Sequence, residues 1–206
     1  MSIATAFSEA KKVTAITNAL EATVSSVAHG FAAGDIVQIA SGWGVIDNTA
    51  ARIKSVTADA FVLEKLNTLN MEFFPVGAGA GTVKKVTTWQ QINKILNPAS
   101  SGGEPKNISV KFLASQSEIS INDGFSAITE SFDIDADEFG SDAYAALLAL
   151  TEVQTETVLK KTLRTGSVIL TPGCVSLNQN VKIDGPIMTN SVSFNGSGRI
   201  TRYKAV

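Results

Sequence analysis

The sequence predicts a mainly β protein of the α+β class, with a β-sandwich or barrel core, one packed helix and a second, smaller β-barrel. Two observations predict the strands: short runs in which apolar and polar residues alternate, and turn-forming Gly, Asn and Asp residues that separate these runs. A third observation predicts the helix, because apolar residues recur at helical spacing over residues 141–153. Short strands punctuated in this way are typical of sandwiches and barrels.

Composition limits the class of protein. The chain has 206 residues, 44% of them hydrophobic, and a formal net charge of −2. Such a chain forms one large or two small domains and carries no basic excess for binding nucleic acid. Cys174 is the single cysteine, so no intramolecular disulfide is possible. No apolar run reaches the roughly 20 residues of a membrane helix and no signal peptide is evident, so we expect a soluble protein made in the cytoplasm.

We divide the chain into three parts. Residues 1–21 are expected to form an N-terminal arm and a first strand, residues 22–86 a small β-barrel, and residues 87–206 the larger core with its helix at about 141–153. Lys11 and Lys12 lie in a run of small residues, which fits either a surface arm or a strand over residues 12–16. Both interpretations stay open.

Strands punctuated by glycine and aspartate predict the small barrel. Turns are expected at Gly30, at Gly34-Asp35 and at residues 57–59. His29 is the only histidine, and without a second His or a Cys partner it cannot complete a zinc site, so we interpret it as a structural turn residue. The glycines of residues 77–81 have no following Lys-Ser/Thr and do not form a phosphate-binding loop.

Residues 88–96 are predicted to form a short helix. Thr88 and Gln91 have the spacing of a capping box, and apolar residues follow on one face. Pro98 would end this helix, and residues 98–105 would then be an exposed loop. A strand is expected from residue 107 to residue 113.

The stretch from residue 117 to residue 153 organises the larger core. Asn122-Asp123-Gly124 predicts a hairpin turn between two alternating runs. In the second run the even positions Ile128, Phe132 and Ile134 are expected to face the core, and the odd positions Thr129, Ser131, Asp133 and Asp135 to form a wet face. Glu130 breaks the pattern, so we expect it near an edge or paired with a basic residue of a neighbour. Ser141 is the expected N-cap of the helix, whose Leu147 and Leu148 face the core.

Two further strand pairs are predicted after the helix. The first turns at Gly166-Ser167, and the second is a hairpin-like pair around Gly196-Ser197-Gly198.

Acidic residues gather in a window between Lys111 and Lys160 that contains no lysine or arginine. They are Glu118, Asp123, Glu130, Asp133, Asp135, Asp137, Glu138, Asp142, Glu152 and Glu156. Caps and a solvated surface are one interpretation, and an acidic surface that faces a polyanion is another. Asp133, Asp135 and Asp137 could also ligate calcium, but the glycine and glutamate of an EF-hand are missing. We find no nucleophile motif and expect no enzyme activity, no cofactor and no metal.

Residues from about 107 to the end resemble the major tail tube proteins of long-tailed, non-contractile phages. The resemblance lies in the segments SEISINDGFSAITESFDID, DAYAALLALTEV, GSVILTPGCVSL and SVSFNGSGRITRYKAV. The N-terminal half, through SSVAHGFAAGDIVQIASGWGVIDNTAARIKSVTADAFVLEKL, resembles the SH3-like barrel modules of phage tail proteins.

This resemblance implies a structural virion subunit. Hexameric rings would stack into a tail tube, and hairpins from adjacent subunits would form an inner barrel through which DNA passes without specific binding. Thr129, Ser131, Asp133 and Asp135 would then face the lumen, and Ser100, Ser101, Gly102 and Gly103 would contact the next ring. The implied partners are further copies of the chain and the tail tip, tape-measure and tail terminator proteins, with no membrane anchor.

Two alternatives remain at this point. A ligand- or receptor-binding β-sandwich of the tail is one, although Trp43 and Trp89 are the only tryptophans available for such a site. A type VI secretion-like tube protein is the other.

Overall fold

The computed structural model describes residues 1–114, 116–183 and 185–205, and its strands fall into two groups. The small barrel is built from β2 (Lys11–Val13), β3 (Ala15–Ile16), β4 (Thr23–Ser25), β5 (Ile36–Ser41), β6 (Thr49–Val56), β7 (Ala60–Leu63) and the first half of β8 (Gly81–Gln91). The rest is built from β1 (Ser2–Phe7), β9 (Ile95–Ser101), β10 (Pro105–Val110), β11 (Ile119–Phe125), β12 (Thr129–Asp135), the short 3-10 helix η1 (Ala136–Glu138), α1 (Asp142–Val153), β13 (Thr157–Thr162), β14 (Val168–Lys182), β15 (Thr189–Gly196) and β16 (Thr201–Tyr203).

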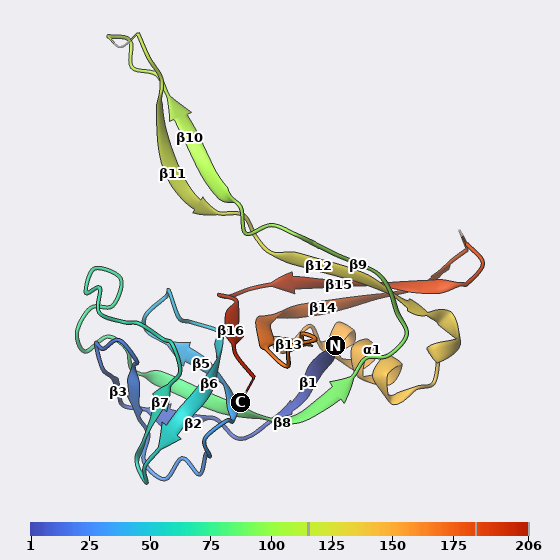
Figure 1. Cartoon of the computed structure of the whole chain (residues 1–206), viewed down its shortest axis with the longest axis horizontal. Coiled ribbons are helices and arrows are strands. Elements are labelled where there is room, and N and C mark those ends of the chain that lie inside the picture. The colour runs from blue at the N-terminus through green and yellow to red at the C-terminus, as the bar shows by residue number, and fades with distance from the viewer. Residues whose placement is uncertain (115, 184, 206) are drawn as a thin grey trace.

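Most strands belong to one continuous antiparallel sheet. In the described chain it has 14 strands in the order β3-β4-β7-β6-β5-β8-β1-β13-β14-β15-β12-β9, with β16 added on β14 and β2 on β8. The sheet curls strongly, so that its first half closes into the small barrel and its second half forms a wider, open layer (Figure 1). β10 and β11 form a separate two-stranded sheet that projects away from the body (Figure 1). The mainly β class with one packed helix is therefore confirmed.

The small barrel has its own core, which runs from Val13 to Val83 in sequence. One of its largest buried side chains is Trp43, which is 1% exposed and donates a hydrogen bond from its indole nitrogen to the carbonyl oxygen of Pro75 over 2.8 Å. The expected turn at residues 57–59 joins β6 and β7, which are paired antiparallel. Because β8 pairs with β5 in its first half and with β1 in its second, one strand links this barrel to the larger sheet.

The N-terminus differs from the expected surface arm. β1 pairs with both β8 and β13, and Ile3 and Ala4 are fully buried. Small side chains are needed here because the strand is covered on both faces. The alternative strand over residues 12–16 appears as two short strands, β2 and β3, separated at Thr14.

The helix predicted over residues 88–96 is wrong. Residues 88–91 continue β8, which pairs with β1 through Ser2 and Gln91, and residues 95–96 begin β9. The capping-box spacing is a weak local preference, and pairing with a buried strand overrides it. The loop expected over residues 98–105 is also largely wrong. Pro98 lies in β9, an edge strand on which a missing N–H group is tolerated.

Two predicted hairpins also differ. Asn122-Asp123-Gly124 lies inside β11, where Asp123 and Gly124 stand opposite the single residue Lys106 as a bulge. Gly124 has a φ of 87°, which explains why the sequence there resembles a turn. The final two strands turn near residues 196–198 as expected, but β15 pairs with β14 and β12, whereas β16 pairs with the other end of β14.

The larger core lies between the wide sheet and α1. Ser141 caps the helix as predicted, because its hydroxyl accepts a hydrogen bond from the Tyr144 N–H group over 3.1 Å. Gln154 closes the other end in the left-handed conformation. The helix packs on β14 and buries Leu147 completely. No helix in the described part of the chain has the length and apolar character needed to cross a membrane.

Candidate functional site: a polar sheet face and a projecting hairpin

The face of the wide sheet that points away from the core is covered by small polar side chains. Directly opposed residues of antiparallel strands share a face, so the register defines cross-strand rows. One row is Ala99, Ser131, Ser193 and Ser176, and the next is Ser101, Thr129, Asn195 and Cys174. These rows belong to β9, β12, β15 and β14. They contain no charged side chain, so the sheet presents a smooth hydroxyl and amide surface.

Asp133 and Asp135 extend this face toward η1. The sequence suggested that Asp133 faces solvent, but its side chain is buried and only 8% of the residue is exposed. It accepts hydrogen bonds from Asn97 Nδ2 over 3.0 Å and from Ser191 Oγ over 2.8 Å. These two bonds, the one from Asn97 being the larger effect, hold the pKa of the Asp133 carboxyl below its ordinary value. The carboxylate is therefore ionised and held in place between the neighbouring strands β9 and β15.

The opposite face of β12 points into the core. Phe132 and Ile134 are each 2% exposed, while Ile128 at the strand entrance is half-buried. Leu147 of α1 is buried behind them, and Leu148 packs at the margin of the same cluster.

Glu130 is the polar exception on this core-facing side. Its side chain is buried, and its carboxylate forms an ion pair with Lys161 Nζ at 2.7 Å and accepts a hydrogen bond from Thr171. The sequence suggested a position near an edge or a basic partner from a neighbouring subunit, but the basic partner belongs to the same chain.

The projecting hairpin of β10 and β11 has two unlike faces. Ile108 pairs with Ile121 and Val110 with Ile119, which gives one apolar face, whereas Asn107 with Asn122 and Ser109 with Ser120 give a polar face. All of these residues except Val110 are exposed to solvent, and Ile121 keeps 52% of its surface accessible. A lone two-stranded hairpin is only marginally stable in water. Its apolar face therefore lacks a cover within the described chain.

A sharp bend joins this hairpin to the sheet. Ser100 and Ser101 are the last residues of β9 and pair with Glu130 and Thr129 of β12. Gly102 and Gly103 follow with φ angles of 88° and 76°. A Cβ atom on Gly102 would overlap the Ala127 carbonyl oxygen, whereas the nearest atom to one on Gly103 would be 3.7 Å away. The four residues expected to contact a neighbouring ring thus form the base of the hairpin.

The acidic window is partly neutralised. Lys94 Nζ lies 2.8 Å from Glu138 and 3.9 Å from Asp135, so it ties η1 to the sheet. Among the described residues no group of three or more His, Cys, Asp and Glu side chains could hold a metal ion.

His29 is buried in the small barrel. Its Nε2 lies 3.0 Å from the Thr57 carbonyl oxygen and its Nδ1 accepts from the Phe31 N–H group, so both ring nitrogens serve a turn.

The comparison with protein families identifies the class. A model described as phage tail tube protein matches residues 41–205. The chain belongs to the phage tail tube protein family. This match covers the strands from β6 onward, α1 and the projecting hairpin, and the family is one of structural virion components. A search of curated proteins finds no match for this tail tube protein.

Sequence reasoning located β12 but missed most of its surroundings. The serine rows on β14 and β15 were not singled out, although NSVSFN and CVSLN alternate small polar with apolar residues and could have indicated them. The amphipathic hairpin was missed because Asn122-Asp123-Gly124 suggested a turn in the middle of β11.

Proposed function

We propose that this tail tube protein assembles into hexameric rings that stack into a tube, through which phage DNA leaves the virion. The observation that supports this proposal most is the projecting hairpin with its uncovered apolar face. An apolar hairpin face that the described residues leave uncovered is suited to cover by a neighbouring copy. The partners would be further copies of the chain and, at the tube ends and inside it, tail tip, tail terminator and tape-measure proteins.

The polar sheet face would line the channel. Thr129, Ser131, Asp133 and Asp135 lie on this side, and the serine rows of β14 and β15 widen it. Basic side chains would bind phosphates and release counterions, which would retain DNA. Neutral hydroxyl groups with a fixed carboxylate make no such attachment, and the lysine that the register places on this face, Lys182, lies at its end in the row of Asp135. The polar face of the hairpin, with its Asn and Ser pairs, has the same chemistry and would continue the channel wall.

The small barrel would stand outside the channel wall. Its main apolar cluster draws on residues 13–83 alone, and it lies to one side of the wide sheet (Figure 1). An SH3-like function for this barrel, in binding a partner or decorating the tube, stays a proposal.

Electron microscopy of concentrated protein tests the assembly. We expect rings or hollow tubes from the natural chain, and uniformly single particles would overturn the proposal. The hairpin can be tested with Ile119→Ser and Ile121→Ser together, which should leave the monomer folded and abolish tubes. The matched control changes two exposed valines of the barrel segment, Val27→Ser and Val76→Ser, and should assemble normally. Normal tubes from the hairpin variant would contradict the role of its apolar face.

A further inference from the structure

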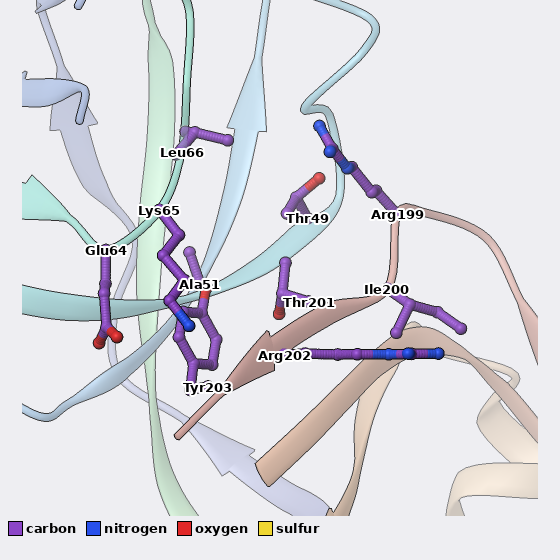
Figure 2. A pocket seen from close by; sticks show the side chains of 10 residues that line it. All are labelled: Thr49, Ala51, Glu64, Lys65, Leu66, Arg199, Ile200, Thr201, Arg202 and Tyr203. Carbon is purple, nitrogen blue, oxygen red and sulfur yellow. The ribbon is translucent and has the colours of Figure 1, made fainter. Parts of the chain in front are cut away.

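A small basic pocket lies where the small barrel meets the C-terminal strand β16 (Figure 2). It has a volume of ≈ 170 Å³ and is lined by residues of β6, of the segment after β7, and of residues 199–203. Lys65, Arg199 and Arg202 are exposed at this pocket, and none of them forms an ion pair with another described residue. The one acidic residue in the lining, Glu64, already accepts hydrogen bonds from Arg52 Nε and Nη2 over 2.6 and 2.9 Å. The pocket is therefore strongly positive.

A second observation points to an anionic ligand. The hydroxyl of Thr49 lies in the pocket lining, is buried, and has no hydrogen-bond partner among the described residues. Figure 2 shows this hydroxyl on the side of the pocket where the Arg199 guanidinium lies. Buried hydroxyl groups are nearly always hydrogen-bonded, so an unpartnered one in the lining of a pocket that also holds unpaired arginines favours an acceptor that arrives from outside.

The pocket also has an apolar part. Leu66 and Tyr203 are buried in its lining, and Ile200 is half-buried between the two arginines. A ligand that combines carboxylates with an apolar group would match both parts.

A surface with carboxylates around an exposed apolar side chain is present elsewhere on this chain. The acidic turn, residues 135–142, joins β12 to α1. In it Asp137 and Asp142 are exposed and form no ion pair with a described residue, and Phe139 between them is 77% exposed. The pairing of Lys94 with Asp135 and Glu138, and the Asp135 cap on Asp137, fix the shape of the turn. A preformed turn loses little conformational entropy when it binds.

The two surfaces cannot meet within one molecule. The acidic turn lies beside α1 at one end of the wide sheet, while β16 and the pocket lie next to the small barrel (Figure 1). Complementary surfaces at different places on one chain make heterologous contacts, which close into a ring when the rotation allows. We propose that the basic pocket binds the acidic turn of a second copy of this chain, with Asp137 and Asp142 at Arg199 and Arg202 and Phe139 on the apolar part. This inference rests on the ring assembly proposed above and specifies a contact between adjacent subunits of the ring.

A charge swap tests the contact. Arg199→Glu with Arg202→Glu should raise the concentration at which half of the protein assembles by about tenfold or more, because like charges would then face each other. Asp137→Lys with Asp142→Lys should do the same. Mixing the two variants should restore assembly, because every contact is complementary in a ring where the two variants alternate. One chain carrying all four changes should assemble nearly as the natural chain does. Sedimentation velocity and electron microscopy measure assembly, and thermal melting of each variant reports its fold.

The matched control is Lys11→Glu with Lys12→Glu, which changes the charge equally on β2 of the barrel and should assemble normally. Normal assembly of the arginine variant, or no recovery in the four-residue variant, would overturn this contact while natural tubes would still support the proposed function. If the natural chain forms no rings, both proposals fail together. Titration with inorganic phosphate gives a further check. Phosphate binding that requires Arg199, together with normal assembly of the swapped variants, would assign the pocket to a free anion instead.

Discussion

The small barrel and the projecting hairpin are built from similar alternating sequences but end in opposite states. In the barrel, Phe61 is 1% exposed and its ring contacts those of His29 and Phe31 at 5.2 and 5.5 Å. In the hairpin, Phe125 is 70% exposed and the isoleucines are about half open. The barrel strands close around their own core, whereas the hairpin has only its own two strands. Alternation therefore predicts a strand with an apolar face, but whether that face is covered within the monomer depends on the tertiary structure.

The largest difference between the two regions is expected when one phenylalanine in each is replaced by alanine. Phe61→Ala should cost roughly 3–5 kcal/mol of folding stability because it leaves a cavity in a closed core. Phe125→Ala should change monomer stability by no more than about 0.5 kcal/mol, as surface substitutions usually do. Chemical denaturation of the unassembled chain measures both. A large loss for Phe125→Ala would show that the hairpin base is packed within the monomer.

A second prediction tests whether the wide sheet, like the barrel, is stabilised by contacts within the monomer. Lys161→Met removes the partner of the buried Glu130 carboxylate and should cost about 3 kcal/mol, near the lower end for such pairs because Lys161 is partly exposed. Replacing both, Glu130→Met with Lys161→Met, should restore most of this loss. If the single change were silent in a denaturation experiment, the ion pair between Glu130 and Lys161 would contribute nothing to the stability of the fold.

Glycine substitutions at the bend test how firmly the hairpin is held to the sheet. Gly102→Ala forces a side chain into the Ala127 carbonyl oxygen at a positive φ, and should cost more than the roughly 1–3 kcal/mol of backbone strain alone. Gly103→Ala is the control, because it has a similar φ but open space. We expect tubes to form poorly from the first and better from the second. Equal assembly of the two variants would mean that the bend angle is unimportant.

A smaller effect is expected from acid. The folded-state pKa of Asp133 is lowered, so its contribution to stability is present above the unfolded value, about 3.8–3.9, and is lost as pH falls through the folded value. Asp133→Asn should therefore flatten the fall in stability of the wide sheet below about pH 4. Thermal melting at a series of pH values measures it, with Asp142→Asn as a control at an exposed carboxylate. If stability fell equally steeply with pH in the Asp133→Asn variant, the Asp133 carboxylate would not be stabilised by its hydrogen bonds in the folded chain.

The sequence by itself determined the parts whose cause is local. Ser141 and the residues after it specify a capped helix, the turn at residues 57–59 specifies β6 and β7, and the alternation from Glu130 to Asp135 specifies β12. These features depend on neighbours within a few residues, where spacing and side-chain size carry the information.

Tertiary structure decided the rest. Residues 88–96 carry a helix-like pattern, but the N-terminal strand β1 pairs with residues 88–91 and holds them in a sheet. Asn122 to Gly124 resemble a turn, but β10 extends past them and turns them into a bulge. In both cases the competing structures differ by about 1 kcal/mol per residue or less locally, so long-range hydrogen-bonded pairing and burial select the fold.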